Sequence, residues 1–212
     1  MRGFDCLVAG IASVIVVAAV ATQQADASPK PPTCDSYPDT VVANGQVKVF
    51  RIGWRRATVR RPEGFYACDV RSRRLRFLGS DAVDARDVRL IRLAGRYVAF
   101  EYHGCQTIYC VHAIVRLNMR NGKRRAFDEP PIGQSEADDA LDLEATPGGN
   151  VVWIRAVTDP AAPRFDVVHW DGTEVTVLDS GPLNEVRARS LAVSGGQAYW
   201  FAGGQAKSAI VD

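Results

Sequence analysis

The chain has 212 residues, of which 26 are basic and 24 acidic, and 47% are hydrophobic. This length is sufficient for one domain with an apolar core, so the chain does not belong to the class of short peptides that cannot bury one. Charge is unevenly distributed: residues 28–127 carry 20 basic and 8 acidic groups, whereas residues 128–212 carry 5 and 14. Such asymmetry can mark a face for a polyanion, or it can belong to a dipolar, solvated repeat protein whose halves attract each other.

Residues 1–27 have the layout of a secretory signal peptide. Arg2 supplies a positive charge, residues 6–21 form an apolar run, and Ala25-Asp26-Ala27 is a small-x-small cleavage site. A retained membrane anchor is the alternative, but the apolar run is shorter than the ~20 residues that a spanning helix needs. We therefore expect residues 28–212 to be a secreted or extracytoplasmic single domain without a membrane span.

A glycine-centred turn recurs about every fifty residues and leads into a strand-like segment with an aromatic residue. The turns are Asn44-Gly45, Ala94-Gly95, Gly148-Gly149 and Gly195-Gly196, and the aromatic residues are Phe50, Phe100, Trp153 and Trp200. A fixed period of this size indicates one supersecondary unit that is copied and stacked. The repeats span about residues 34–80, 87–128, 141–180 and 186–212.

Each complete repeat has the pattern of four strands. In the second repeat, residues 87–93 and 96–102 flank the Ala94-Gly95 turn, and residues 111–118 and 123–128 flank Asn121-Gly122. Asn-Gly predicts a tight hairpin in which both residues have positive φ. In the last repeat the expected strands are residues 186–192, 197–201 and 207–211, and a fourth strand is missing.

This pattern predicts an all-β fold of about four repeats of a four-stranded antiparallel meander, β-propeller-like, with an incomplete last repeat. The apolar period of two and the many β-branched and aromatic residues disfavour helices. A two-sheet sandwich or an irregular β-solenoid is the alternative within the all-β class. A ring of repeats could close if residues 32–37 supplied the missing strand; otherwise its edges are open to a partner.

The segments Leu-Ala-Gly-Arg-Tyr-Val-Ala-Phe (93–100) and Val-Leu-Asp-Ser-Gly-Pro (177–182) resemble secreted bacterial repeat proteins of the β-propeller superfamily. The similarity is to WD-repeat-like and TolB-like types and to uncharacterised exported proteins with a few such repeats. Trp170-Asp171 resembles the WD dipeptide at the end of a third strand. The resemblance implies the architecture and transfers no functional residue.

Four cysteines remain after removal of the signal peptide, which implies disulfides with three possible pairings. Of these pairings we favour Cys34–Cys68 and Cys105–Cys110. The second pair lies in the pattern His103-x-Cys105-x4-Cys110-x-His112, which could instead hold zinc. Because exported thiols are generally oxidised, we predict a disulfide there, and we expect no metal site and no cofactor.

Carboxylates and the remaining histidine offer weak catalytic candidates. A cluster between the second and third repeats could bind calcium or act as an acid and base pair, but an exposed inter-repeat loop is the simpler interpretation. Its members are Glu136, Asp138, Asp139, Asp142 and Glu144. His169 is most simply structural. The chain contains no nucleophile elbow, phosphate loop or metalloprotease helix motif.

Trp54 is flanked by four arginines that could bind a polyanion at the cell surface by charge and stacking. They are Arg55, Arg56, Arg60 and Arg61. Because an exported chain rarely meets nucleic acid, we do not expect a nucleic-acid partner. The preferred hypothesis is a non-enzymatic exported module that binds a protein or an envelope polymer.

The alternative function is an extracellular carbohydrate-active hydrolase or lyase. In it, carboxylates from different loops would converge near the axis of the repeats. The available groups are Asp69, Glu101, Asp138 and Asp159.

Overall fold

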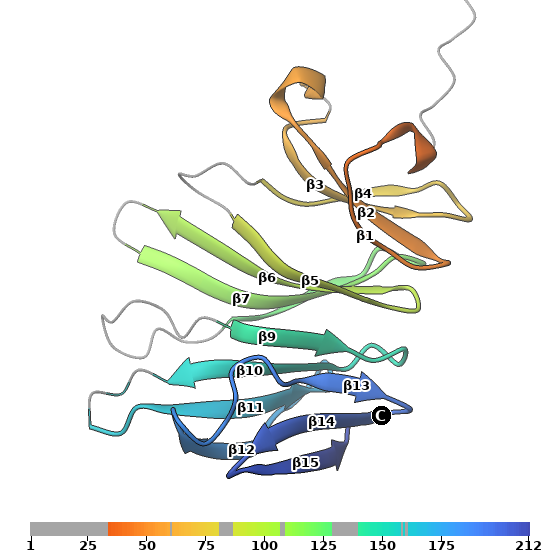
Figure 1. The fold of residues 1–212 in the computed structure, drawn as a ribbon. Helices are drawn as coiled ribbons and strands as arrows, with labels where there is room; N and C mark the ends of the chain where they lie inside the picture. Colours follow the sequence, from red (N-terminus) through yellow and green to blue (C-terminus); the bar gives the residue numbers. More distant parts are fainter. Residues whose placement is uncertain are drawn as a thin grey trace, which may run out of the picture. The chain divides into compact units, whose positions relative to one another are not determined.

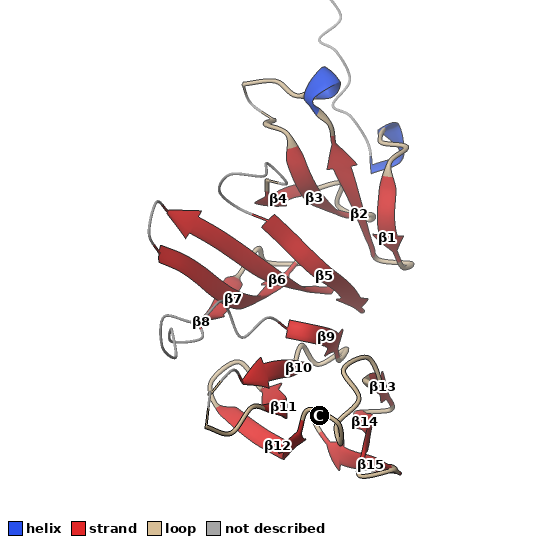
Figure 2. Ribbon diagram, turned by 60° about the vertical axis from the view of Figure 1, so that its left-hand side comes forward, coloured by secondary structure: helices blue, strands red, loops and turns tan. Residues whose placement is uncertain are grey.

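The computed structural model describes residues 34–59, 61–80, 87–106, 109–128, 140–157, 159 and 161–212. These residues form strands and two short 3-10 helices, η1 (Cys34–Ser36) and η2 (Trp54–Arg56), which both belong to the first repeat (Figures 1 and 2). The strands of the first two repeats are β1 (Thr40–Ala43), β2 (Val47–Ile52), β3 (Gly64–Asp69), β4 (Leu75–Gly79), β5 (Asp87–Ala94), β6 (Tyr97–Gln106), β7 (Tyr109–Asn118) and β8 (Arg124–Asp128). Those of the last two are β9 (Ala140–Ala145), β10 (Val151–Val157), β11 (Arg164–Trp170), β12 (Val175–Pro182), β13 (Ala192–Ser194), β14 (Gln197–Ala202) and β15 (Gln205–Ile210).

The strands form four antiparallel sheets in chain order, with four, four, four and three strands. Within each sheet, strands adjacent in sequence are hydrogen-bonded neighbours, so each sheet is a meander. The first strands of successive sheets, β1, β5, β9 and β13, contact one another in turn. The predicted all-β, propeller-like fold class with an incomplete last repeat is confirmed.

The sheets pack face to face because their strands are apolar on both faces. In β2, Val47 and Val49 pack against the second sheet, whereas Phe50 and Ile52 face the other way. A strand that is buried on both faces reads as a nearly continuous apolar run, as this one does. Separate apolar clusters fill the spaces between the first and second, second and third, and third and fourth sheets.

The recurring aromatic residue of each repeat points toward the preceding sheet. Phe100 packs with residues of the first sheet, Trp153 with residues of the second and Trp200 with residues of the third. All three side chains are buried. The sequence repeat therefore marks the position that seals each interface between sheets.

Phe50 occupies the same position in the first sheet, where a short N-terminal segment takes the place of a preceding sheet. The Tyr37 ring stacks on Phe50 with centroids 4.1 Å apart and an interplanar angle of 6°. Cys34, in η1, forms the predicted disulfide with Cys68 of β3, with Cα atoms 5.8 Å apart. Residues 34–37 thus cover the first sheet and do not supply the missing strand of the fourth.

The opposite face of the fourth sheet has a different composition from the equivalent faces of the other sheets. Val49, Ala99 and Val152 precede the recurring aromatic in the first three repeats and are fully buried. Tyr199 takes this place in the fourth repeat; it is 41% exposed, and its hydroxyl donates to Gln197. The face of the fourth sheet that carries Tyr199 is therefore partly exposed.

Two local predictions are wrong. Residues 186–191 do not form a strand: Val186 makes an isolated bridge to Ala202, and β13 starts at Ala192. The reason is a long-range contact, since the Leu191 amide donates to the Asp142 carboxylate instead of to a neighbouring strand.

The predicted two-residue turn at Asn121-Gly122 is also wrong. Residues 119–123 connect β7 to β8, and the Gly122 amide donates to the Asn118 carbonyl. Gly122 has a φ of 74°, but Asn121 does not have a positive φ. The predicted hairpin itself is present, and four- and five-residue hairpin loops are commonly built around a type I turn.

The turn after Trp170 is organised by Asp171. Its carboxylate accepts hydrogen bonds from the Thr173 hydroxyl at 2.7 Å and from the amides of Thr173 and Glu174. These bonds, that of the Thr173 side chain first, lower the pKa of Asp171 to about 2. Because the folded pKa lies below the ordinary value of 3.8, the stabilisation is complete above that value and is lost as the pH falls toward 2.

We expect Thr173→Val to raise the pKa of Asp171 part of the way toward 3.8, because the two backbone donors remain. A titration of the carboxyl carbon by NMR would measure the shift, with Thr176→Val on β12 as the control. An unchanged pKa in Thr173→Val would contradict this account of the turn.

Candidate functional site

The connections between strands lie at two opposite ends of the sheets because all four sheets have the same strand order. The turns between first and second strands, and between third and fourth strands, lie at one end, which we call the turn end. The remaining connections, including those from one sheet to the next, lie at the other, the loop end (Figure 1). Any site built from connections must belong to one of these two ends.

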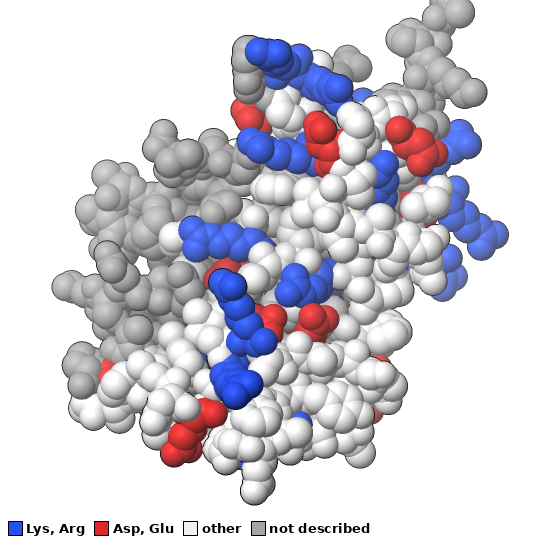
Figure 3. Space-filling model, in the orientation of Figure 1, with Lys and Arg blue, Asp and Glu red and all other residues white. Residues whose placement is uncertain are grey.

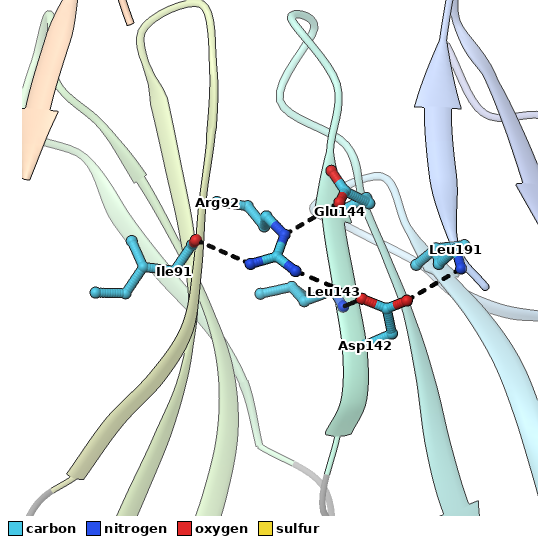
Figure 4. A network of polar contacts seen from close by, with 6 residues as sticks. All are labelled: Ile91, Arg92, Asp142, Leu143, Glu144 and Leu191. Atoms are coloured by element: carbon cyan, nitrogen blue, oxygen red, sulfur yellow. Dashed lines mark hydrogen bonds and ion pairs between the residues drawn. The ribbon is translucent and has the colours of Figure 1, made fainter. Parts of the chain in front are cut away.

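Charged side chains also meet between the sheets, on the first strands β5 and β9. Arg92 extends from β5, just after a β-bulge at which Leu90 has a φ of 47°. The Arg92 Nε donates to Glu144 Oε1 at 3.0 Å, and its Nη2 lies 3.5 Å from Asp142 Oδ1 (Figure 4). We call Arg92, Asp142 and Glu144 the inner-strand clamp.

The clamp connects three sheets. Asp142 accepts hydrogen bonds from the Leu143 amide at 3.1 Å and from the Leu191 amide, at the entry to the fourth sheet, at 3.0 Å. The third guanidinium nitrogen of Arg92 donates to the Ile91 carbonyl at 3.2 Å. Because all three nitrogens of Arg92 are engaged, we interpret the clamp as a structural fastening and not as a ligand site.

Burial affects the ionisation of the clamp. It raises the pKa of Glu144, and the hydrogen bond and charge of Arg92 act against this increase. The expectation that Asp142 and Glu144 lie in an exposed loop is therefore wrong: both are on β9, and Asp142 is buried. Glu136, Asp138 and Asp139 lie outside the described residues.

Two further buried carboxylates are held by neighbouring side chains or backbone. Asp166 on β11 accepts hydrogen bonds from Arg155, Arg164 and Ser180, so it ties β10, β11 and β12 together. Glu101 on β6 accepts the Ala140 amide at 3.0 Å, at the start of β9.

The carboxylates proposed for a hydrolase do not share one site. Asp69 lies at the turn end, where it accepts the Ser72 amide at 2.7 Å, and Asp159 lies in the β10–β11 connection at the loop end, where it accepts the Ala161 amide. Glu101 is buried between sheets, and Asp138 is not among the described residues. The described members are thus separated, and Asp69, the last residue of β3, and Asp159 each organise a local turn.

The sequence-predicted arginine cluster lies at the loop end of the first sheet. Arg55 and Arg56 belong to η2, and Arg56 lies 3.9 Å from the Asp39 carboxylate. Arg61 donates to the Tyr37 hydroxyl at 2.7 Å, which supports the cover over Phe50. Arg60 and the Trp54 side chain are outside the described part, so polyanion binding here stays a prediction.

In the hairpin of β6 and β7, the backbone register pairs Cys105 with Cys110 and His103 with His112, as the sequence pattern requires. The His103 and His112 rings are 4.4 Å apart, and His112 Nδ1 lies 3.2 Å from Glu101 Oε1. The cysteine side chains are outside the described residues, so their disulfide stays a prediction. Within the described residues, no group of three or more His, Cys, Asp or Glu side chains could hold a metal ion.

No protein-family profile matches the chain, and no curated protein matches it. Among solved structures, it is similar to the β-propeller domain of the Trilobed protease from Pyrococcus furiosus, a propeller described as having an open velcro topology. The match has 16% identity and a TM-score of 0.41, and it covers 55% of this chain and 33% of that one. Across the described residues, no helix is long and apolar enough to span a bilayer.

Proposed function

We propose that this protein is exported and acts as a non-enzymatic binding module. Its partner would be a protein or an envelope polymer, and the connections at one end of the sheets would recognise it. The observation that carries this proposal is the use of the charged groups between the sheets. Within the inner-strand clamp, and separately around Asp166, the charged side chains pair with one another. This leaves the connections as the exposed recognition elements.

Two features of the chain support export. Residues 6–21 form an apolar run before a small-x-small site, as in secretory signal peptides. Cys34 and Cys68 form a disulfide, and disulfides form and persist mainly in oxidising compartments.

The hydrolase alternative receives less support from the described carboxylates. Asp69 and Asp159 organise turns at opposite ends, and Glu101 is 1% exposed and bonded to backbone. General acid and base catalysis requires groups within hydrogen-bond reach of the same reacting atoms.

A thermal-shift screen of the exported chain from Ser28 tests the proposal, with neutral and anionic glycans, envelope polymers and divalent cations as ligands. We expect one class of polymer to raise the Tm saturably. A ligand at 100 times its Kd stabilises by about 2.7 kcal/mol. For a chain of this size that is roughly 5 to 10 °C.

The same mixtures should be analysed for product after prolonged incubation. An unchanged polymer together with a saturable shift supports a binding module. Depolymerisation at a rate that depends on the protein concentration would contradict the proposed binding module and favour the hydrolase alternative.

A further inference from the structure

We infer that the turn end of the first two sheets binds an anionic polysaccharide. This inference rests on the proposed function and specifies its ligand and surface. The surface consists of six cationic side chains in three neighbouring turns, and we call it the basic turn surface. Its members are Arg71, Arg73, Arg74, Arg96, Arg120 and Lys123.

Hydrogen bonds join the turns that carry these cations into one surface. The Val70 amide, next to Arg71, donates to the Gln46 carbonyl at 2.9 Å. The Arg96 Nε donates to the side-chain oxygen of Gln46 at 3.2 Å, and the Met119 amide, next to Arg120, donates to the Arg96 carbonyl at 2.9 Å. Backbone hydrogen bonds thus join the turns within each sheet, and the side-chain bond between Arg96 and Gln46 joins the two sheets.

The charged groups of five of these side chains are exposed and form no salt bridge within the described part of the chain. Arg71, Arg73, Arg74, Arg120 and Lys123 are exposed, and none of them forms a salt bridge with another described residue. In Figure 3, Lys and Arg side chains project from the side of the first sheet at which its turns lie in Figure 1. Neighbouring like charges repel one another, so a group without anionic partners favours an external anion.

Other arginines of the second sheet have structural roles, which sets the basic turn surface apart. Arg116 donates to the Gly149 and Asp171 carbonyls, and Arg125 donates to the Gly172 carbonyl, so both fasten the second sheet to the third. Arg124 donates to the Leu78 carbonyl at 3.4 Å and lies over the Phe100 ring. The chain therefore uses some arginines to join sheets and leaves others exposed at the turns.

Asp69, the carboxylate at the edge of the basic turn surface, is buried and hydrogen-bonded within its own turn. Asp69 is 4% exposed and accepts the Ser72 amide. Burial raises the pKa of Asp69, but hydrogen bonds from Ser72 and the charge of Arg96 outweigh it and lower the pKa below its ordinary value. Asp69 thus accepts the Ser72 amide inside its own turn, and it forms no salt bridge with any of the five exposed cations.

The turn end of the last two sheets has the opposite charge. Its turns carry Asp171 and Glu174, Asp212 lies beside Gly148 and Gly196, and residues 146–150, 171–174, 195–196 and 211–212 contain no lysine or arginine. Arg116 and Arg125 of the second sheet bond to carbonyls of these turns and offset part of the negative charge there, so an extended polyanion would be attracted more strongly to the first two sheets than to the last two. This contrast restricts the binding surface to one half of the turn end.

The chemistry of the surface favours a polysaccharide over other polyanions. Five of the six cations are arginines, whose planar guanidinium matches the paired oxygens of sulfate, phosphate and carboxylate groups. The turns at residues 44–46, 70–74, 95–96 and 119–123 contain no aromatic residue on which a nucleic-acid base could stack. They present Val70 as a single large apolar side chain, which is too little to insert into a bilayer.

The test compares two variants that each lose four positive charges, with heparin as the probe. The turn variant carries Arg71→Gln, Arg74→Gln, Arg120→Gln and Lys123→Gln. It spares Arg73, whose φ is 57°, and Arg96, whose Nε bonds to Gln46. The loop-end variant tests the rival candidate, the arginine cluster that the sequence predicts as a polyanion site: Arg55→Gln, Arg56→Gln, Arg60→Gln and Arg61→Gln.

We expect the turn variant to bind heparin at least tenfold more weakly than the unchanged chain in 0.1 M salt. We also expect its log Kd to depend less steeply on log salt concentration, because fewer ion contacts remain. The loop-end variant should bind within threefold of the unchanged chain. A thermal melt of each variant confirms that it is folded.

Several results would overturn the inference. These are no heparin binding by the unchanged chain, equal losses in both variants, or a loss confined to the loop-end variant. The assignment to a polysaccharide would also be refuted if single-stranded DNA or vesicles of anionic lipid bound as tightly as heparin and the turn variant lost this binding. A ligand from the thermal-shift screen that the turn variant binds normally would contradict this surface and leave the binding module intact.

Discussion

Replacing Cys34 and Cys68 together with serine should lower the free energy of unfolding by about 3–4 kcal/mol. The disulfide closes a loop with a sequence separation of 34 residues. In the chain-entropy model a crosslink of this span removes roughly that much entropy from the unfolded state. It also holds η1 beside the first sheet, where Tyr37 stacks on Phe50. Chemical denaturation of the oxidised chain and of the double variant would measure the difference.

Tyr37→Ala tests whether this cover takes the place of a preceding sheet. Tyr37 is 8% exposed, so we expect its truncation to lower the free energy of unfolding even when the disulfide is intact. Hydrogen exchange of the β2 amides, such as that of Phe50, should accelerate in both variants, while that of the β10 amides changes less. A loss below about 1 kcal/mol in the cysteine double variant would mean that the crosslink does not hold the cover in place.

Arg92→Met should lower the free energy of unfolding by about 2–3 kcal/mol. The change removes the cation that Asp142 and Glu144 share, and removing one partner from a buried ionic group typically costs about 3–5 kcal/mol. The expected loss is smaller because the Arg92 side chain is 36% exposed. Methionine keeps most of the aliphatic stem, so the loss reports mainly on charge and hydrogen bonding.

The pH dependence of this loss separates charge from packing. Arg92 stabilises the ionised form of Glu144, whose pKa is raised by burial. The contribution of this pair is therefore complete above the pKa of Glu144 and disappears as the pH falls below it. We expect the difference between Arg92→Met and the unchanged chain to be largest near neutral pH and to shrink in acid.

Lys207→Met provides the matched control for the clamp. Lys207 pairs with Asp179 at 2.8 Å across the third and fourth sheets but is 45% exposed, so its loss should cost at most about 1 kcal/mol. A double-mutant cycle of Arg92→Met with Glu144→Gln would measure the coupling directly. Equal effects of Arg92→Met and Lys207→Met at every pH would contradict the role that we assign to the clamp.

Local patterns predicted most of the strands because they depend on neighbours in the sequence. The alternation around Phe50 and Trp153 and the glycine-centred turns before them report directly on extended backbone and chain reversal. The prediction was wrong for residues 186–191, where an amide bonds to a carboxylate 49 residues away. A local sequence pattern does not contain information about a contact over this separation.

The inner-strand clamp was missed for the same reason. Asp142 and Glu144 belong to an acidic stretch of the sequence, and they were assigned with it to an exposed loop. The third repeat was predicted to begin at residue 141, so their alternation with Leu141 and Leu143 already indicated a strand, and the arginines of β5 were the candidates for a partner. Which arginine would reach them depended on a bulge in β5 that the sequence does not mark.

From its sequence alone this chain could be assigned to four copied antiparallel units, with Cys34 and Cys68 as a favoured crosslink, because backbone periodicity and a small number of cysteines are local or countable properties. The division of its arginines between joining sheets and facing solvent came only from the packed sheets. Arg120 and Arg125 lie in one basic run, yet the first is exposed at a turn and the second is half-buried and bonds to the Gly172 carbonyl of another sheet. The strand face from which each side chain leaves, and the neighbour packed against that face, determine this difference.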